Sequence, residues 1–280
     1  SIFEEQIEND VLEDFNVNEE FLTHSTAESV YKERSRDFYI DKYMKLLMKA
    51  KKELSIPVIA SICCKSPDNW AEYAKRFIAC GADAIELNYY PIASDASVSG
   101  AIVDKNFEQF AKFASRTIKC PLSLKIGYKY SSIANNIRIL DREGIDGVVL
   151  FNRFFRPDID INTLEFKSGI VTSSPYEYGE SLRWIGLMSG KVKLDLAGNT
   201  GIHSGETAIK MLLAGAKAVE ICSVIIEDGF SAISKMNNEI SSWMDEKKFA
   251  TIDSFCGMLA EEKNIEGYKW ERTQFLKTIN

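Results

Sequence analysis

The chain has 280 residues, of which 45% are hydrophobic and 27% are charged, and this balance excludes disordered and fibrous proteins. Its 41 acidic residues outnumber the 34 basic ones, and a net charge of −7 without a long basic run argues against nucleic-acid binding. No apolar run reaches the roughly 18 residues of a membrane span, the start does not resemble a signal peptide, and two histidines with six scattered cysteines give no metal-site spacing. We therefore expect a cytoplasmic protein with reduced thiols that binds no membrane, no metal and no nucleic acid.

Residues 1–56 are expected to form an acidic loop followed by one helix over 39–54, without a clear strand. Beyond them, six short runs are rich in apolar and β-branched residues, which is typical of buried strands. These runs are 57–63, 84–90, 121–127, 147–153, 193–199 and 218–225. The shorter intervals between them have room for one helix and two turns, so the pattern predicts repeated βα units and a parallel sheet.

The segments between these runs carry helical signals. Ile133, Ile137 and Leu140 recur at helical spacing ahead of Gly144, and the segment 204–215 repeats this scheme. In the tracts GADAIE, GIDGVV and GAKAVE, a glycine ends a helix and leads directly into the next run. Six similar units predict an α/β fold of the (β/α)8 TIM-barrel type. An open α/β sheet of six strands is the alternative.

Two features depart from a regular barrel. Residues 158–161 and 170–172 alternate with period two, which predicts an inserted β-hairpin near 158–174 over the barrel mouth. A barrel of this type closes with eight strands, whereas six are visible and the chain starts without methionine. We therefore expect a single barrel domain over 1–280 that is N-terminally incomplete, with its first two strands absent.

Alternation along the strands indicates which polar side chains lie near the strand ends. In the run 121–127 the apolar residues share one face and suit the helix layer, so Lys125 is expected to point inward, where a lysine requires a paired anion. The alternative is that Lys125 reaches solvent. Asn88 shares a face with Glu86, while alternation leaves the face of Asn152 open. Asparagine both donates and accepts, as a heterocyclic ligand requires, but it also forms turns.

An anion-binding signal lies in the last two units. The tract GNTG (198–201) ends one run and Ser204 starts the next helix, so free backbone N–H groups and a helix N-terminus are expected to meet an anion. Cys222 and Ser223 end the last run, and the loops after the last two strands of a barrel commonly bind phosphate. The alternative is that the glycines serve only the turn. His203 reads as a helix-start residue rather than a catalytic base.

Seven tracts carry a likeness to a known family. They are IPVIASI (56–62), GADAIELN (81–88), PLSLKIG (121–127), GIDGVVLFNRFFRPDIDI (144–161), SLRWIGLMSG (181–190), GNTGIHSGETAIKMLLAGAKAVEICSVI (198–225) and ERTQFLK (271–277). Together they resemble the flavin-dependent dihydroorotate dehydrogenase family, especially its bacterial dihydroorotate dehydrogenase-like branch. GVVLFNRFFRPDIDI and GIHSGE are specific, whereas GADAIELN is shared with other barrels.

The resemblance implies a homodimeric, FMN-binding barrel that oxidises dihydroorotate to orotate in pyrimidine biosynthesis. Lys125 and Asn88 would line the isoalloxazine, and Asn152 would bind the substrate or the flavin edge. The family's additional N-terminal segment would supply the two missing strands and a flavin-contacting lysine. The backbone N–H groups that would hold the FMN phosphate are those of Thr200, Gly201, Cys222 and Ser223.

One position departs from the family. Its members carry a catalytic Cys or Ser base three residues after the asparagine, and the residue here is Pro91. Proline cannot accept a proton, while oxidation of dihydroorotate removes one alongside hydride transfer. Tyr90, Ser94, Ser97 or Ser99 could substitute, and nothing selects among them, so the catalytic base stays unknown. The alternatives are an FMN oxidoreductase with a different cyclic substrate and a catalytically degenerate flavin-binding protein.

Overall fold

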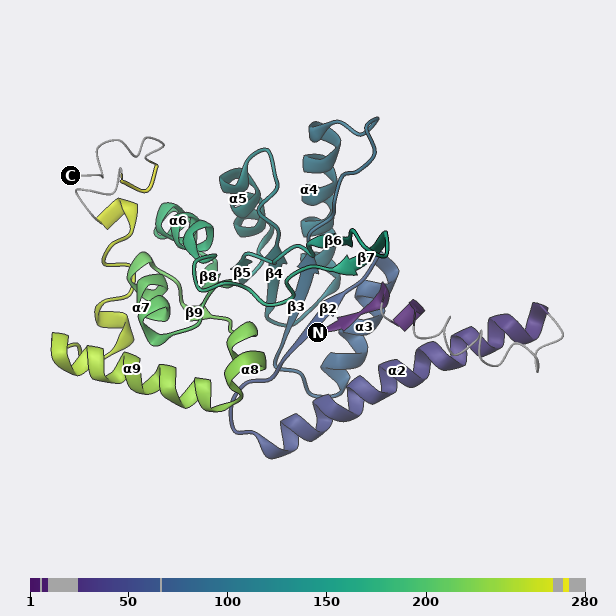
Figure 1. The fold of residues 1–280 in the computed structure, drawn as a ribbon, viewed down its shortest axis with the longest axis horizontal. Helices are drawn as coiled ribbons and strands as arrows, with labels where there is room; N and C mark the ends of the chain where they lie inside the picture. The colour runs from purple at the N-terminus through teal and green to yellow at the C-terminus, as the bar shows by residue number, and fades with distance from the viewer. Residues whose placement is uncertain (6, 10–24, 66, 264–268, 272–280) are drawn as a thin grey trace. The chain divides into compact units, whose positions relative to one another are not determined.

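The computed structural model of the chain describes residues 1–5, 7–9, 25–65, 67–263 and 269–271. It is an α/β protein in which parallel strands alternate with helices (Figure 1). The chain divides into two compact units, Ser1–Tyr89 with Asn106–Leu124 and Tyr90–Lys105 with Lys125–Asn280. The division passes through α4 (Gly100–Thr117) and β4 (Leu122–Ile126), so each unit contains part of both elements.

The first unit holds parallel strands in the order β1-β2-β3-β4. Besides parts of α4 and β4, the unit consists of β1 (Ile2–Phe3), α2 (Ser25–Glu53), β2 (Ile59–Cys63), α3 (Pro67–Ala79) and β3 (Ala84–Tyr89). Tyr73 and Phe77 of α3 are fully buried, as are Ile62 of β2 and Ile85 of β3, because α3 packs on these two strands. Apolar burial of this kind is the main force that holds the helix on the sheet.

The start of the first unit differs from the sequence-based expectation. Residues 1–56 were expected to lack a strand, but Ile2 and Phe3 pair in parallel with Ile62 and Cys63 as β1. The helix expected over 39–54 begins earlier, at Ser25. A strand of two residues is too short to show a period, and the first half of α2 carries many charged residues without an apolar stripe, so neither feature left a signal in the pattern.

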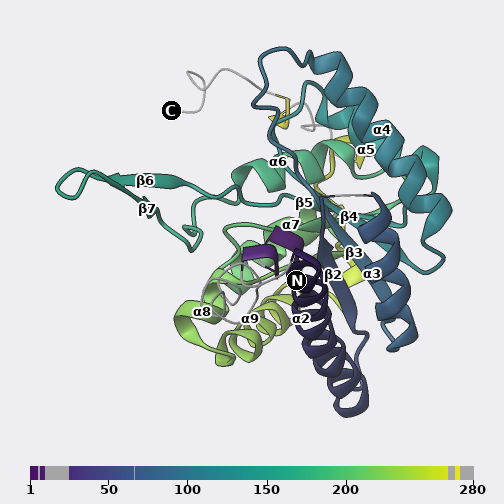
Figure 2. The same cartoon turned by 90° about the vertical axis from the view of Figure 1, so that its right-hand side faces the viewer.

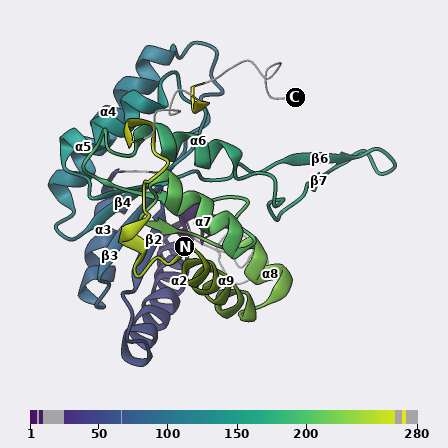
Figure 3. The same cartoon turned by 90° about the vertical axis from the view of Figure 1, so that its left-hand side faces the viewer.

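The second unit continues the parallel order from the end of β4 as β4-β5-β8-β9. Helices α6, α7 and α9 pack side by side, with α6 against β8 and α7 against β9 (Figures 1 and 3). The elements of this unit are α5 (Ile133–Glu143), β5 (Gly147–Leu150), β6 (Pro157–Asp160), β7 (Glu165–Ser168), α6 (Gly179–Met188), β8 (Asp195–Gly198), α7 (Gly205–Ala214), β9 (Ala218–Val219), α8 (Ser223–Asp228), α9 (Ser231–Lys247) and the 3-10 turns η2 (Ile252–Ser254) and η3 (Glu261–Lys263).

The predicted helix ends of this unit are confirmed. The hydroxyl oxygens of Ser132 and Ser204 accept hydrogen bonds from backbone N–H groups in the first turns of α5 and α7. Gly144 and Gly215 end these helices with φ of 79° and 116°, which glycine adopts without steric cost. Across the described residues, every helix falls short of the combined length and apolarity that a membrane span requires.

The predicted hairpin exists, but its second strand lies earlier than expected. β6 and β7 pair antiparallel, with Pro157 opposite Ser168 and Asp160 opposite Glu165, and the hairpin projects from its unit (Figures 2 and 3). Residues 170–172, which were expected to form the returning strand, are outside it. The chain is fixed there by hydrogen bonds from the Arg153 side chain rather than by a strand partner.

The fold class is therefore confirmed as α/β with parallel strands and intervening helices, an arrangement consistent with a (β/α)8 barrel. The prediction of a single domain over 1–280 stays a prediction.

Candidate functional site

The turn after β8 has a fixed backbone shape. The hydroxyl of Thr200 and the Nδ2 of Asn199 both donate to the carbonyl of Phe151 at 2.9 Å. Gly201 has φ 75°, and a Cβ there would lie 2.5 Å from the backbone nitrogen of Tyr178. Both the positive φ and the lack of space exclude a side chain at Gly201. The second glycine of the GNTG tract is therefore required for steric reasons, independently of any role in binding.

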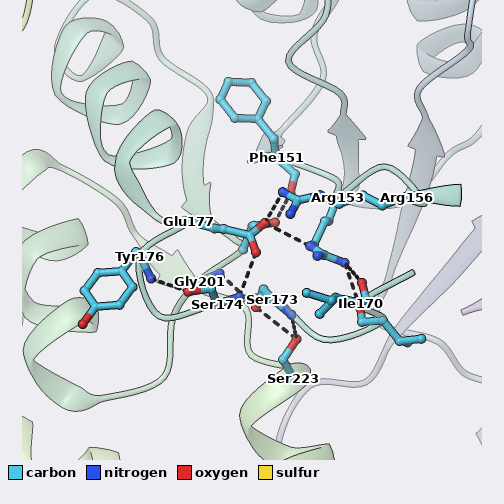
Figure 4. Close-up of polar contacts among 12 residues, drawn as sticks. Phe151, Arg153, Arg156, Ile170, Ser173, Ser174, Tyr176, Glu177, Gly201 and Ser223 are labelled. Carbon is cyan, nitrogen blue, oxygen red and sulfur yellow. Dashed lines mark hydrogen bonds and ion pairs between the residues drawn. The ribbon is translucent and has the colours of Figure 1, made fainter. Parts of the chain in front are cut away.

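Ser173 connects the turn after β8 with the start of α8 (Figure 4). Its hydroxyl accepts a hydrogen bond from Gly201 N at 3.3 Å and donates to Ser223 Oγ at 3.0 Å. Its backbone N–H donates to the same Ser223 oxygen at 2.8 Å. Ser173 is only 7% exposed, so these contacts are largely shielded from water. Gly201 and Ser223, which the sequence singled out for phosphate, are therefore brought together.

The ring of His203 adds to this cluster. Its Nε2 lies 3.1 Å from Ser173 Oγ, and its Nδ1 lies 3.6 Å from Glu227 Oε2 on α8. His203 does precede the N-cap residue Ser204, as predicted. The sequence gave no sign that its ring also faces Ser173, because the partners lie far away along the chain.

The N-terminus of α7 differs from the expectation that it is open to an anion. Ser204 Oγ accepts the hydrogen bond of Thr207 N at 3.3 Å, and Glu239 Oε2 on α9 accepts that of Gly205 N at 2.6 Å. The carboxylate of Glu239 thus takes the position in which an anion would meet the helix dipole. The anion-binding candidates are therefore the hydroxyl cluster and the glycine turn.

Glu177 is the centre of a polar network beside this cluster (Figure 4). One carboxylate oxygen accepts from Arg153 Nε at 3.0 Å and from Arg156 Nη2 at 2.8 Å, and the other accepts from Ser174 N at 2.8 Å. Burial acts to raise the pKa of Glu177, but the Ser174 hydrogen bond and the two arginines outweigh it, so the pKa lies below its ordinary value. Glu177 is therefore a fixed anion at neutral pH.

Arg153 ties the returning chain of the hairpin to the end of β5. Its Nη1 donates to the carbonyls of Ile170 and Val171, at 2.9 Å each. These bonds fix the chain at residues 170 and 171 without a strand partner, so their alternation in sequence did not mark a strand. Its Nη2 is buried and has no hydrogen-bond partner within the described residues.

Lys125 is half-buried and paired. Its Nζ lies 2.7 Å from Glu220 Oε2, and the side chains of the two residues are 17% and 31% exposed. The neighbouring Leu124 and Ile126 are fully buried on the opposite face, so the alternation predicted for β4 is confirmed. Its side chain is held in an ion pair and keeps only part of its contact with solvent. The anionic partner that a lysine withdrawn from water requires is Glu220, directly after β9.

In the first unit, Asn88 and Glu86 share one face of β3, as predicted. Both contact the hydroxyl of Ser61, which donates to Glu86 Oε1 at 2.9 Å and accepts from Asn88 Nδ2 at 2.8 Å. Asn88 Nδ2 also donates to Ile62 O at 3.0 Å. Asn88 is 4% exposed, so its amide is held in one orientation.

The remaining predicted residues lie at or near strand ends. Asn152 follows β5, and its backbone N–H donates to Ile126 O at 2.8 Å. Cys222, Pro91 and Ser94 are exposed, and Tyr90 is half-buried. No described side chain selects Tyr90 or Ser94 as a catalytic base.

Three aromatic side chains of the second unit gather near strand ends. Phe154 is 9% exposed and lies edge-on to Tyr90 and Tyr128, with ring centroids 5.7 Å apart in each pair. A Cβ on Gly127 would lie 2.7 Å from the Phe154 ring, so the ring can pack there only because residue 127 has no side chain. The amino group of Lys129 lies 5.0 Å from the centroid of the same ring.

Parallel strands followed by a rigid glycine turn, linked hydroxyls and a half-buried, paired lysine define an α/β protein whose polar side chains gather at the strand ends. Residues 36–244, more than half of the chain, match the family model described as dihydroorotate dehydrogenase. The chain belongs to the dihydroorotate dehydrogenase family and is therefore an oxidoreductase.

Individual relatives agree with this assignment at low identity. The chain is 29% identical over 240 residues to a protein of Methanocaldococcus jannaschii named dihydroorotate dehydrogenase B (NAD(+)), catalytic subunit, with 79% of this chain and 74% of the relative covered. It is 25% identical over 228 residues to dihydroorotate dehydrogenase A (fumarate) of Lactobacillus delbrueckii subsp. bulgaricus, with 79% and 70% covered. A second B-type catalytic subunit, from Thermodesulfovibrio yellowstonii, is 26% identical over 215 residues, with 75% and 71% covered.

Sequence reasoning missed Ser173, Glu177 and Glu220. Ser173 and Glu177 lie after the hairpin, in a stretch before α6 whose sequence has no helical or strand period. The requirement that Lys125 be paired did point to an acidic partner, and the alternation within AVEICSVI could have proposed Glu220.

Proposed function

We propose that the protein is an FMN-dependent oxidoreductase that oxidises dihydroorotate to orotate, a step of pyrimidine biosynthesis. The observation that carries the proposal is the cluster in which Ser173 joins Gly201 to Ser223, in a chain of the dihydroorotate dehydrogenase family. The names of the A-type and B-type relatives support the substrate.

The residues of the cluster fit a phosphate group. Phosphate oxygens accept hydrogen bonds, and the Ser173 hydroxyl is surrounded by three further groups that can donate them, namely the hydroxyl of Ser223, the N–H of Gly201 and the ring of His203. The bond from Gly201 N to Ser173 is 3.3 Å long, near the limit of a hydrogen bond, so a phosphate oxygen can replace it at little cost. The backbone N–H groups of Thr200 and Cys222 complete the proposed set.

Lys125 is the residue that we propose beside the flavin ring. FMN, when bound, would supply the acceptor of the substrate's hydride. Lys125 would direct its cation at the electron-rich edge of the ring, and Glu220, 2.7 Å away, would set how much of this charge the ring experiences. Asn152 is proposed as a contact of the substrate or flavin edge, and Asn88 as a ring contact from the family resemblance alone.

The test is reduction of the bound flavin by substrate. The protein is loaded with FMN, freed of excess cofactor and mixed with dihydroorotate in the absence of oxygen, while the visible absorbance band of the flavin is followed. The band should bleach with dihydroorotate and stay unchanged with orotate, which is the control. An FMN-loaded sample that does not bleach removes dihydroorotate as the substrate, and a protein that does not retain FMN removes the cofactor.

A second candidate keeps the flavin and changes the substrate. Pro91 stands where the family carries its base, and the aromatic rings of Tyr90, Tyr128 and Phe154 offer apolar contacts near strand ends. Such walls suit a less polar ring than dihydroorotate, whose amides and carboxylate require hydrogen-bond partners. Screening cyclic amides and enones by the same bleaching assay separates this candidate from the first. Tight FMN binding without turnover by any reductant would instead indicate a catalytically degenerate flavin-binding protein.

From the family resemblance we also propose a cytoplasmic homodimer. Light scattering coupled to gel filtration measures the mass in solution, and a monomer at micromolar concentration would contradict the dimer.

A further inference from the structure

A cavity of about 460 Å³ lies within the helical layer of the second unit. Ala134 and Arg138 of α5, Trp184 and Leu187 of α6, and Trp270 are among its lining residues. The volume is within the range of small-molecule sites, and the walls are mainly apolar with a few charged groups, as such sites usually are. The cavity shares no residue with the cluster around Ser173.

Trp270 forms one wall and is held in place by two contacts. Its indole Nε1 donates to the carbonyl of Leu259 at 2.9 Å. Its ring lies directly on Gly186 in the last turn of α6, where a Cβ would lie 2.5 Å from the ring carbon Cε2. Glycine is unfavourable inside a helix, so its presence here has a packing reason: it makes room for the indole. The wall is therefore a built feature of the fold.

The rim of the cavity carries an excess of positive charge. Arg138 and Arg183 are exposed, and neither forms an ion pair or hydrogen bond with another described residue. Lys191 is paired with Glu261, and Glu271 adds one further carboxylate. Among the residues that the structure describes here, three cations against two carboxylates leave one positive charge, which favours a monoanion over a phosphate dianion. Since the whole chain carries a charge of −7, this surplus is local.

We propose that this cavity binds a small planar aromatic carboxylate. Its ring would stack on the indoles of Trp184 and Trp270, and its carboxylate would meet the guanidinium groups of Arg138 and Arg183, whose paired N–H groups match two carboxylate oxygens. The site stands independently of the proposed oxidoreductase activity, since it uses different residues and needs no flavin.

The test uses calorimetric titration of the FMN-loaded chain with 2-naphthoate, and with 2-naphthamide as the neutral probe of the same shape. The carboxylate should bind at least tenfold more tightly than the amide. The double variant Arg138→Gln/Arg183→Gln should weaken 2-naphthoate by roughly tenfold or more and leave 2-naphthamide unchanged, on the scale of one lost charged contact. Arg142→Gln, which changes an exposed arginine of the same helix that does not line the cavity, is the matched control.

Gly186→Ala tests the apolar wall separately. The added methyl group should displace Trp270 and weaken both probes together, while circular dichroism reports whether the helices are retained. Equal affinity for the acid and the amide, unchanged binding by the double arginine variant, or competition by excess FMN would each overturn the proposal, because the probe would then bind elsewhere or without the stated chemistry. Failure of 2-naphthoate, benzoate and indole-3-acetate to bind at millimolar concentration would overturn it as well.

Discussion

Replacing Glu177 by glutamine should destabilise the protein by roughly 2–3 kcal/mol, because it leaves the guanidinium of Arg153 without its counter-ion in a largely buried place. The side chains of Arg153 and Glu177 are 16% and 19% exposed, and their charged atoms are 3.0 Å apart. Loss of one partner of a fully buried pair costs about 3–5 kcal/mol, and partial exposure lowers this figure. Arg156 contributes little, since its side chain is 55% exposed.

The assay is thermal and urea unfolding of the wild type and the variant. A loss of this size should lower Tm by roughly 4–12 °C, at about 2–4 °C per kcal/mol for a chain of this length. The control is Glu206→Gln, which removes an even shorter pair, 2.7 Å from Lys210, but at a carboxylate that is 77% exposed. That variant should stay within about 0.5 kcal/mol of the wild type.

The stability difference between the wild type and Glu177→Gln should also depend on pH, in a direction set by the pKa of Glu177. The folded pKa of Glu177 lies below the ordinary value of 4.5, so the ion pair contributes its full stability above that value and loses it as the pH falls through the folded pKa. The difference between wild type and Glu177→Gln should therefore be constant near neutrality and narrow on acidification below about pH 4. A variant as stable as Glu206→Gln, or a deficit that does not shrink in acid, would refute the reasoning.

Three further perturbations test the candidate site. Lys125→Met should lower the midpoint potential of bound FMN and slow flavin reduction by roughly one to three orders of magnitude, whereas Glu220→Gln should raise the potential; shifts in the same direction would contradict their pairing. Ser173→Ala should weaken FMN binding, measured by calorimetry, by roughly fivefold, on the scale of one hydrogen bond. The neighbouring variant Ser174→Ala is the control, and an equal loss of affinity in both variants would contradict a specific role of Ser173 in binding. Gly201→Ala should lower the free energy of unfolding in urea by roughly 1–3 kcal/mol, and unchanged stability would show that the turn tolerates a side chain.

Much of the fold could be predicted because the signals lie within single elements. The alternation of β4 correctly placed Leu124 and Ile126 in the core and Lys125 on the other face. Ser204 and Gly215 correctly marked the ends of α7, since a cap depends only on its own helix. β1 could not be predicted, because two residues carry no period and its existence depends on pairing with β2.

The site was predictable only in part for the same reason. Gly201 and Ser223 were selected because the turns after consecutive parallel strands end at the same edge of a sheet, and the structure does bring them together through Ser173. The path of the chain from 170 to 177 was not predictable, because Arg153 and Glu177 determine it through contacts that leave no local pattern.

The inserted segment between β5 and α6 therefore builds the candidate site. Arg153 holds the carbonyls of the returning chain, and Glu177 holds Arg153, so Ser173 arrives between Gly201 and Ser223 (Figure 4). The backbone of residues 177–178 fills the space of a missing side chain at Gly201, so insert and turn also fit sterically. A phosphate group held at Ser173 would bind only while this arrangement is intact. The coupling is reciprocal: the free energy by which binding stabilises the arrangement equals the binding free energy that is lost when the arrangement is lost. Changes at Glu177 should consequently weaken cofactor affinity as well as stability, although Glu177 itself need not touch the cofactor.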